Sequence, residues 1–239
     1  VASNAAFAPF ESVDPSGKIV GFDVDVLEAV AAKGGFKVRF VNTPWEGIFN
    51  TLNSGEAHIV ASGVTITDVR KQSMDFSQPY FEAKQLIAVK PDSKAANFND
   101  VKAQTIGVLT GSTGDEVVSK LIGKTNTQIK RFESTPMALQ ELQAGGVNSV
   151  VSDNGVIRHY VTNNANSKFK LLEDASFEPE FYGFVVKKGN TELQGKIDTG
   201  LKAIKADGTY DKIYSKWFGT APAATAAKPA SAPASAASK

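Results

Sequence analysis

The sequence predicts an α/β fold in which two lobes are built on parallel sheets. Segments with the apolar pattern of strands alternate with amphipathic helical segments, which is typical of such sheets. Glycines follow several of the helical segments, at the positions where helices end. Two extended segments, 80–84 and 179–183, each precede an apolar run and look like crossovers between lobes. A two-stranded bridge of this kind permits hinge closure around a ligand.

The first elements are a strand and a helix within residues 17–35. Leu27, Val30 and Ala31 share one face of that helix, and two glycines close it. Residues 36–43 alternate like a strand. They are followed by a short amphipathic helix within 45–57 and then by a buried strand. That strand, HIVASG, occupies residues 58–63.

The second half repeats this order. Residues 105–123 contain a strand, a glycine-rich turn and a helix. The next helix lies in 134–146, where Thr135 is the expected N-cap and Pro136 stands in the first turn. The remaining elements are a strand at 147–154 and two helices at 190–208 and 209–219.

The crossovers suggest domain boundaries. If both bridge the same gap, one lobe comprises 1–82 plus 183–219, and the other comprises 83–182. Two strands of a single sheet would look similar in the sequence, so that alternative stays open. Residues 220–239 contain only Ala, Pro, Ser, Thr and Lys, which predicts a disordered tail because no large apolar side chain is present. A lipid-anchor tether is the functional alternative for this tail.

Composition excludes several classes of function. The net charge of +1 gives no reason to expect nucleic acid or an anionic membrane as partner. The chain has no cysteine, which excludes disulfides, cysteine nucleophiles and thiolate metal sites. The two histidines stand apart without catalytic or metal-binding neighbours, so we expect neither a metal nor a cofactor. The chain starts without a signal peptide, so either the protein is cytosolic or a targeting segment has been removed.

The segment ASGVTITDVRK, residues 61–71, follows the buried strand and suggests a carboxylate site. Arg70 falls in the first turn of a helix, and its planar guanidinium can bind a carboxylate with two hydrogen bonds. The hydroxyls of Ser62 and Thr65 and the backbone at Gly63 could complete this site. The alternative is that Arg70 forms a surface ion pair with Asp68 or Asp75 while Thr67 caps the helix.

Three further places at strand ends suit a charged ligand. The turn TGSTGDE, residues 110–116, presents a helix N-terminus suited to an anion, but it lacks the lysine of a nucleotide-binding P-loop. Asp153 ends a strand and could pair with an ammonium group. Phe7 and Trp45 could stack on a ligand. Ordinary turn capping, helix capping and core packing are the respective alternatives. Together these groups predict a site for a zwitterion with an α-carboxylate and an α-ammonium.

Several motifs resemble a known family. GFDVDVLEAVAAKGG, SGVTITDVRKQSMDFSQPYF, TGSTGDE, VVSDN and GTYDKIYSKWFG occur in the order found in the bacterial family 3 solute-binding proteins, the polar-amino-acid receptors of ABC importers. The chain is most similar to the arginine/lysine/histidine-binding and glutamine-binding members. The resemblance implies a type II periplasmic-binding fold whose two lobes close over one L-amino acid. It also implies a non-enzymatic monomer that lies in the periplasm, or is lipid-anchored at the cell surface, and docks on an inner-membrane permease.

The resemblance assigns a role to each matching residue. Arg70 corresponds to the clamp of the α-carboxylate, assisted by Thr65 and by the backbone of Thr113. Asp153 corresponds to the acid that binds the α-ammonium, together with the Gly63 carbonyl and the Thr65 hydroxyl. The remaining side-chain contacts are assigned to Phe7, Trp45 and Ser62. Asp23 and Asp25 in the signature are expected to begin a helix without touching the ligand.

One position departs from the family pattern. Asn4 stands where members that bind cationic side chains, and many that bind glutamine, carry an aspartate. A buried cation without a partner is unfavourable by several kcal/mol. Glu11 or Trp45 could compensate for a basic ligand such as arginine or lysine. Otherwise glutamine or histidine is favoured. A cyclohexadienyl-dehydratase-like enzyme and the sensing domain of a membrane receptor are the competing functions.

Overall fold

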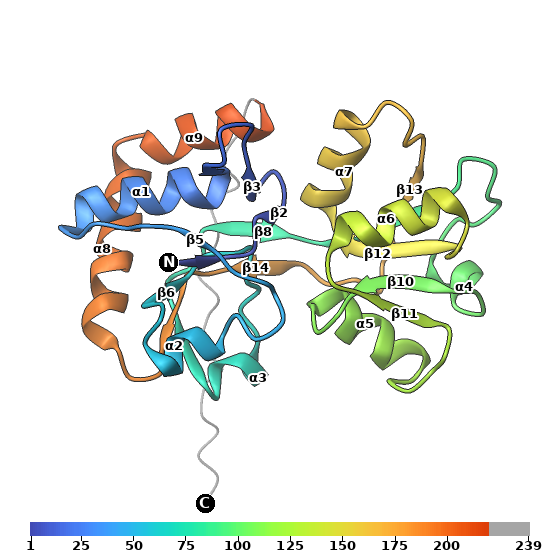
Figure 1. The fold of residues 1–239 in the computed structure, drawn as a ribbon, viewed down its shortest axis with the longest axis horizontal. Helices are drawn as coiled ribbons and strands as arrows, with labels where there is room; N and C mark the ends of the chain where they lie inside the picture. The colour runs from blue at the N-terminus through green and yellow to red at the C-terminus, as the bar shows by residue number, and fades with distance from the viewer. Residues whose placement is uncertain (220–239) are drawn as a thin grey trace, which may run out of the picture.

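The computed structural model describes residues 1–219 and contains two five-stranded sheets (Figure 1). The predicted tail at 220–239 lies outside the described residues. Figure 1 shows the two sheets side by side, each with its own helices, and two strands running between them. We call each sheet with its covering helices a lobe. No helix of residues 1–219 has the length and apolar character needed to cross a membrane.

The first lobe is assembled from both ends of the chain. Its sheet has the order β5-β1-β6-β15-β7 and consists of β1 (Ala2–Ser3), β5 (Val41–Asn42), β6 (Ile59–Val60), β7 (Met74–Phe76) and β15 (Val185–Lys187). Its helices are α1 (Phe22–Gly34), α2 (Asn50–Ser54), α3 (Asp68–Lys71), α8 (Thr191–Ala206) and α9 (Thr209–Phe218). A small antiparallel sheet of β2 (Ala6–Phe7), β3 (Glu11–Val13) and β4 (Ile19–Val20) completes it.

The second lobe is one continuous segment of the chain. Its sheet has the order β11-β10-β12-β9-β13 and consists of β9 (Gln85–Val89), β10 (Ile106–Leu109), β11 (Ile129–Phe132), β12 (Ser149–Asp153) and β13 (Lys170–Leu172). Its helices are α4 (Phe98–Val101), α5 (Thr113–Ile122), α6 (Thr135–Ala144) and α7 (Asn154–Asn163). Strand β9 is buried throughout: Ile87 and Val89 face the cluster under α5, while Leu86 and Ala88 face the cluster under α6 and α7. Helices therefore cover both faces of this sheet, as expected for strands that are mostly parallel.

The two crossovers pair with each other. Strands β8 (Phe81–Ala83) and β14 (Glu180–Tyr182) form an antiparallel two-stranded sheet in which Phe181 lies opposite Glu82. Figure 1 shows this pair running between the lobes. The predicted lobe boundary at 82/83 falls within β8, and that at 182/183 falls at the end of β14; the division into lobes stays a prediction.

Each main sheet contains one reversed strand, which the prediction of parallel sheets did not include. In the first lobe β15 is antiparallel to both β6 and β7, and in the second lobe β9 is antiparallel to both β12 and β13. Each of these strands directly follows a crossover. In each lobe the chain enters the sheet directly from the bridge. This strand is therefore antiparallel to its neighbours, which the chain reaches through other connections.

Three local predictions need correction. Within 36–43 only β5 forms a strand, because Phe36, Val38 and Phe40 pack against the core of the first lobe without pairing to a neighbouring strand. The helix predicted within 45–57 is limited to α2. The N-cap of α6 is Ser134 rather than Thr135, since the Ser134 hydroxyl accepts a hydrogen bond from the backbone N–H of Met137.

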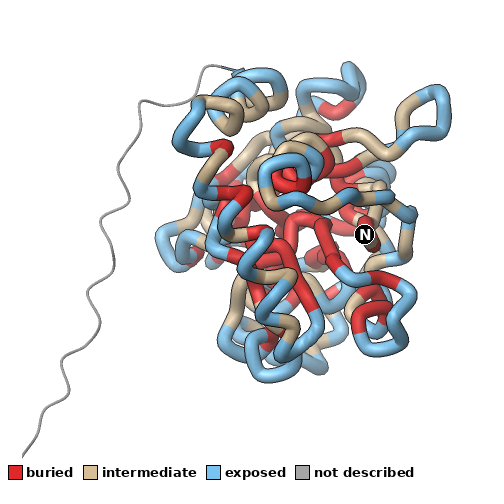
Figure 2. Tube along the Cα trace, turned by 90° about the vertical axis from the view of Figure 1, so that its left-hand side faces the viewer, coloured by how far each residue is buried: buried red, intermediate tan, exposed pale blue. Residues whose placement is uncertain are grey.

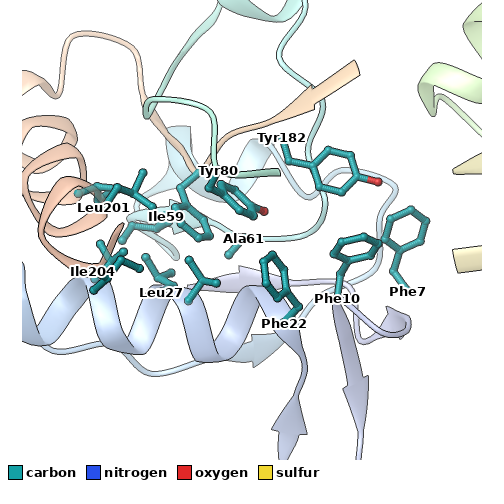
Figure 3. Packing of buried hydrophobic residues seen from close by; sticks show 14 of the residues in the cluster. Phe7, Phe10, Phe22, Leu27, Ile59, Ala61, Tyr80, Tyr182, Leu201 and Ile204 are labelled. Carbon is teal, nitrogen blue, oxygen red and sulfur yellow. The ribbon is translucent and has the colours of Figure 1, made fainter. Parts of the chain in front are cut away.

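The core of the first lobe leads directly to the gap between the lobes. Figure 2 shows buried residues along the inner strands and helix faces and exposed residues on the outer turns. Phe10, Phe22, Tyr80 and Tyr182 belong to one cluster of packed aromatic rings in this core. Figure 3 shows Phe7 at one end of this cluster, with the Tyr182 hydroxyl directed toward the same end. The core thus supports side chains that face the second lobe.

Candidate ligand-binding site

A pocket lies between the two lobes. The first lobe contributes Asn4, Phe7, Trp45, Ser62, Gly63, Thr65 and Arg70 to its lining, and the second contributes Leu109, Ser112, Thr113 and Asp153. Strands β1, β6, β10 and β12 end at or next to these residues, so the pocket is at the C-terminal ends of parallel strands, where α/β folds bind their ligands. Every residue predicted for the site lies in this lining except Glu11. The predicted roles of these residues stay a prediction.

Arg70 is held inside the pocket by backbone carbonyls of both lobes. It is only 8% exposed, and it donates from Nη1 to the Thr65 carbonyl at 3.0 Å and from Nη2 to the Gly111 carbonyl at 3.4 Å. Burial lowers the pKa of the guanidinium. Asp68 pairs with Lys71 and Asp75 pairs with Lys188, so the surface ion pair considered as an alternative for Arg70 is absent. Thr67 does cap helix α3, through the backbone N–H of Arg70.

The turn at Ser62 and Gly63 forms the floor of the pocket. Ser62 Oγ accepts from the Asn4 backbone N–H at 2.9 Å and donates to Glu11 Oε1 at 2.9 Å. Gly63 has φ +54°, and a Cβ there would lie 2.7 Å from the Phe7 ring. Only glycine fits this close approach, because a side chain would meet both an unfavourable backbone conformation and a buried ring.

Asp153 brings a buried carboxyl group to the second lobe. Gln85 Nε2 donates to its Oδ1 at 2.9 Å, and the Tyr182 hydroxyl donates to its Oδ2. Burial, followed by repulsion from Glu180, raises the pKa of Asp153 to about 6. Asp153 stands at the N-cap position of α7, but its side chain makes no capping hydrogen bond. The helix-capping alternative therefore does not account for its carboxyl group.

The hydroxyls of Thr65 and Thr113 converge on a carboxylate that we did not predict. Thr65 Oγ1 donates to Glu180 Oε2 at 2.9 Å, and Thr113 Oγ1 donates to the same oxygen at 2.7 Å. Gln85 Nε2 lies 3.3 Å from Glu180 Oε1. Glu180 belongs to β14, so this strand of the bridge is hydrogen-bonded to both lobes. The helix start at Thr113 thus faces an anion, as expected for an N-terminus, but here the anion is part of the protein.

The aromatic side chains Phe7 and Trp45 lie on the walls of the pocket. Phe7 also packs against Phe10, with ring centroids 5.9 Å apart. The guanidinium of Arg70 lies 5.7 Å from the Trp45 ring centroid and 5.6 Å from that of Phe49, which is within cation–π range. Trp45 therefore contacts the predicted carboxylate clamp as well as the cavity.

Asn4 and Glu11 differ in their relation to the cavity. The Nδ2 of Asn4 donates to the Thr43 carbonyl at 3.3 Å, and Asn4 also lines the pocket. Glu11 is fully buried behind Ser62 and does not line the pocket.

Gln85, Glu180 and Tyr182 are the contributions that sequence reasoning missed. Glu180 lies in the second crossover, and Gln85 directly follows the first. Nothing in their spacing along the sequence relates them to Thr65, Thr113 or Asp153. Tyr182 lies in the second crossover, where its sequence context is that of an ordinary core residue. Ser112 was also not predicted as a lining residue, although it lies within the turn TGSTGDE that was identified as a possible anion site.

Comparison with known proteins is consistent with this geometry. The family model for bacterial extracellular solute-binding proteins, family 3, matches residues 1–220. A probable histidine-binding protein of Neisseria gonorrhoeae is 48% identical over 219 residues, covering 91% of this chain and 82% of that protein. The arginine-, lysine-, histidine-binding protein of Geobacillus stearothermophilus has a TM-score of 0.89 and 48% identity, covering 92% of this chain and 95% of that one. An ancestral arginine-binding protein bound to glutamine has a TM-score of 0.84 and 44% identity, covering 91% and 96% of the two chains.

These similarities confirm the type II periplasmic-binding fold expected from the sequence motifs. The relatives are named as binding proteins, so the dehydratase-like enzyme loses its support. The chain belongs to family 3 of the bacterial extracellular solute-binding proteins.

Proposed function

We propose that this protein is the amino-acid receptor of an ABC importer and binds one L-amino acid between its lobes. Arg70 binds the α-carboxylate, and Asp153 binds the α-ammonium together with the Gly63 carbonyl. The observation that carries this proposal is that Arg70 and Asp153 are the only charged residues in the lining and come from opposite lobes. A zwitterion neutralises both, so binding it favours closure.

The side chain of the ligand lies between Phe7 and Trp45, next to Asn4. Since the Asn4 amide can accept through Oδ1 and donate through its second N–H, a side chain with both a donor and an acceptor is favoured. The lining has no carboxylate left for a cation once Asp153 is paired. Glutamine and neutral histidine therefore fit better than arginine and lysine, and the similarity to a probable histidine-binding protein supports histidine.

A basic side chain is the second candidate, supported by a neighbouring hollow. This hollow shares Asn4, Trp45 and Leu109 with the pocket and is also lined by Glu46 and Glu133, one from each lobe. A long cationic side chain could reach these exposed carboxylates. The similarity to the arginine-, lysine-, histidine-binding protein agrees with this alternative.

The partner in the proposed function is the permease of the importer. After closure the two lobes present a surface that exists only with bound ligand, which allows the permease to distinguish loaded from empty receptor. The family consists of extracellular solute-binding proteins, and we propose the periplasm as the location.

The decisive experiment is a titration of the twenty amino acids, ornithine and citrulline by calorimetry. The protein is first unfolded and refolded to remove any carried-over ligand. We expect binding near micromolar Kd, about −8 kcal/mol, for a small set of nitrogen-bearing amino acids. Binding of no amino acid at millimolar concentration would overturn the proposal.

Arg70→Ala tests the assigned orientation. Loss of two hydrogen bonds to a carboxylate, each contributing about 1.5–3 kcal/mol, is expected to weaken binding by more than a hundredfold. Arg158→Ala is the matched control, because Arg158 is exposed and pairs with the exposed Glu173. Affinity of the Arg70 variant within threefold of the wild type would place the carboxylate elsewhere.

A further inference from the structure

Two fully buried carboxyl groups face each other behind the pocket. Glu11 on β3 and Asp23 on α1 both have no exposed surface and interact directly through their side chains. Neither lines the pocket, and the proposed function does not use them. Two adjacent buried carboxylates would repel each other strongly, since the surrounding dielectric is low.

The hydrogen bonds around the two groups leave one oxygen of each without a donor. Glu11 Oε1 accepts from Ser62 Oγ at 2.9 Å. Asp23 Oδ2 accepts from the Gly63 N–H at 2.8 Å and from the Tyr80 hydroxyl at 2.7 Å. Glu11 Oε2 and Asp23 Oδ1 are buried and have no hydrogen-bond partner among residues 1–219.

A single proton satisfies both of these oxygens. We infer that Glu11 and Asp23 share one proton, carried on Glu11 Oε2 and donated to Asp23 Oδ1, and that this pair positions Ser62 and Gly63 for ligand binding. Asp23 is the member that ionises first as the pH rises, with a pKa that burial raises to about 7, because two donors already stabilise its charge. Glu11 is the neutral acid, so its other oxygen remains free to accept from Ser62.

The charged and titratable surroundings agree with a retained proton. Burial, followed by the charge of Asp23, raises the pKa of Glu11 well above 4.5, and burial raises the pKa of Asp23 to about 7. The groups that face the pair are Tyr80, Asp153 on β12 and Tyr182 on β14, none of which is a cation. No basic side chain of residues 1–219 forms an ion pair or a hydrogen bond with either acid.

The pair lies one hydrogen bond from the pocket floor. Glu11 orients the Ser62 hydroxyl, which also accepts from the Asn4 backbone, and Asp23 fixes the N–H of Gly63. The Gly63 carbonyl, on the same turn, is the proposed partner of the α-ammonium. Loss of the shared proton would place two charges behind this turn and disturb both ligand-contacting residues.

Glu11→Gln tests the proton without depending on any ligand. The amide keeps an acceptor for Ser62 and supplies a fixed N–H to Asp23, but it cannot titrate. In the wild type, native Glu11 stays protonated above pH 4.5 while the unfolded chain loses the proton, so stability falls as pH rises toward the raised native pKa. One such proton changes the folding equilibrium constant tenfold per pH unit.

We therefore expect urea unfolding between pH 5 and 7 to give a shallower pH dependence for Glu11→Gln than for the wild type. The infrared band of a protonated carboxylic acid at pH 7 should weaken in the same variant. Glu28→Gln, at an exposed position of α1, is the control and should leave both unchanged. Parallel stability profiles of wild type and Glu11→Gln would overturn the shared proton.

The positioning role rests on the proposed function and is read from ligand affinity. Glu11→Gln should bind the amino acid found by calorimetry within threefold of the wild type, whereas Glu11→Ala should bind at least tenfold more weakly. Rescue by the amide shows that hydrogen bonding at this position, rather than charge, matters. Equal affinity of all three proteins would overturn the positioning role. If Glu11→Ala does not fold, the positioning role is judged from Glu11→Gln alone, and a tenfold loss of its ligand affinity would overturn that role. The shared proton is still tested by the pH dependence of unfolding.

Discussion

At the scale of single residues, the site depends on buried ionisable groups whose charge is maintained by neighbours. Asp153 has its pKa raised to about 6, since burial and Glu180 outweigh the hydrogen bonds from Tyr182 and Gln85 and the charge of Arg70. An α-ammonium would stabilise the carboxylate and lower this pKa again. Binding of the ammonium must therefore be linked to deprotonation of Asp153.

The pH dependence of affinity tests this linkage. Above about pH 6 Asp153 is already ionised and affinity should be constant. Below that value binding must expel a proton, so Kd should rise toward tenfold per pH unit. Calorimetry in buffers of different ionisation enthalpy measures the proton released.

Asp153→Asn provides the control for this prediction. The variant should bind more weakly and lose the proton release, and it should discriminate less between an amino acid and its deaminated analogue. Equal losses for both ligands would break the assignment of Asp153 to the ammonium.

At the scale of elements, β14 does more than connect the lobes. Its first residue, Glu180, accepts hydrogen bonds from Thr65 of the first lobe and from Thr113 of the second. These threonines border the pocket, so a carboxylate of the bridge joins the two lobes through hydrogen bonds. The stronger these hydrogen bonds are, the less of the free energy of lobe closure the bound amino acid must supply.

Glu180→Gln should shift the ligand-free protein toward an open arrangement. One oxygen remains for the two threonines, but the new Nε2 would face the Gln85 Nε2, and two donors do not pair. Small-angle scattering should show a larger radius of gyration without ligand, and Glu178→Gln, an exposed neighbour, should not change it. An unchanged radius would mean that Glu180 does not hold the lobes together.

The sequence predicts some features of the structure better than others. The end of α1 was predictable, because Gly35 adopts the left-handed conformation that stops helices. The strand at 36–43 was predicted too long, since alternating apolar residues pack equally well as an unpaired segment against a core. Glu180 had no signal at all, because its partners lie 67 and 115 positions away and only the bridge brings them together.

At the scale of the whole molecule, two cores are joined by two short strands. Each lobe buries apolar side chains on both faces of its own sheet. The pair β8–β14 is the element between the sheets, so rotation at these strands can change the gap. We expect ligand to reduce the radius of gyration while leaving the secondary structure content constant.

Deletion of residues 220–239 tests where the folded unit ends. The sequence of this segment contains no side chain able to add to a core, so the chain 1–219 should have the melting temperature of the full chain. Differential scanning calorimetry of both chains decides this. A clear decrease would show that the segment contributes packing to the rest of the protein.

The reversed strand β15 also has a consequence for the order in which the chain can fold. It lies between β6 and β7, and β7 has no other neighbour in its sheet. The first-lobe sheet cannot be completed until residues 185–187 are available to pair, and all of 85–172 precedes them in the chain. The later-encoded lobe is thus free to fold first, and the N-terminal strands must wait with apolar surface uncovered. Strand pairing across so long a stretch of sequence slows folding. The N-terminal strands, with apolar surface still uncovered, are therefore expected to bind chaperones.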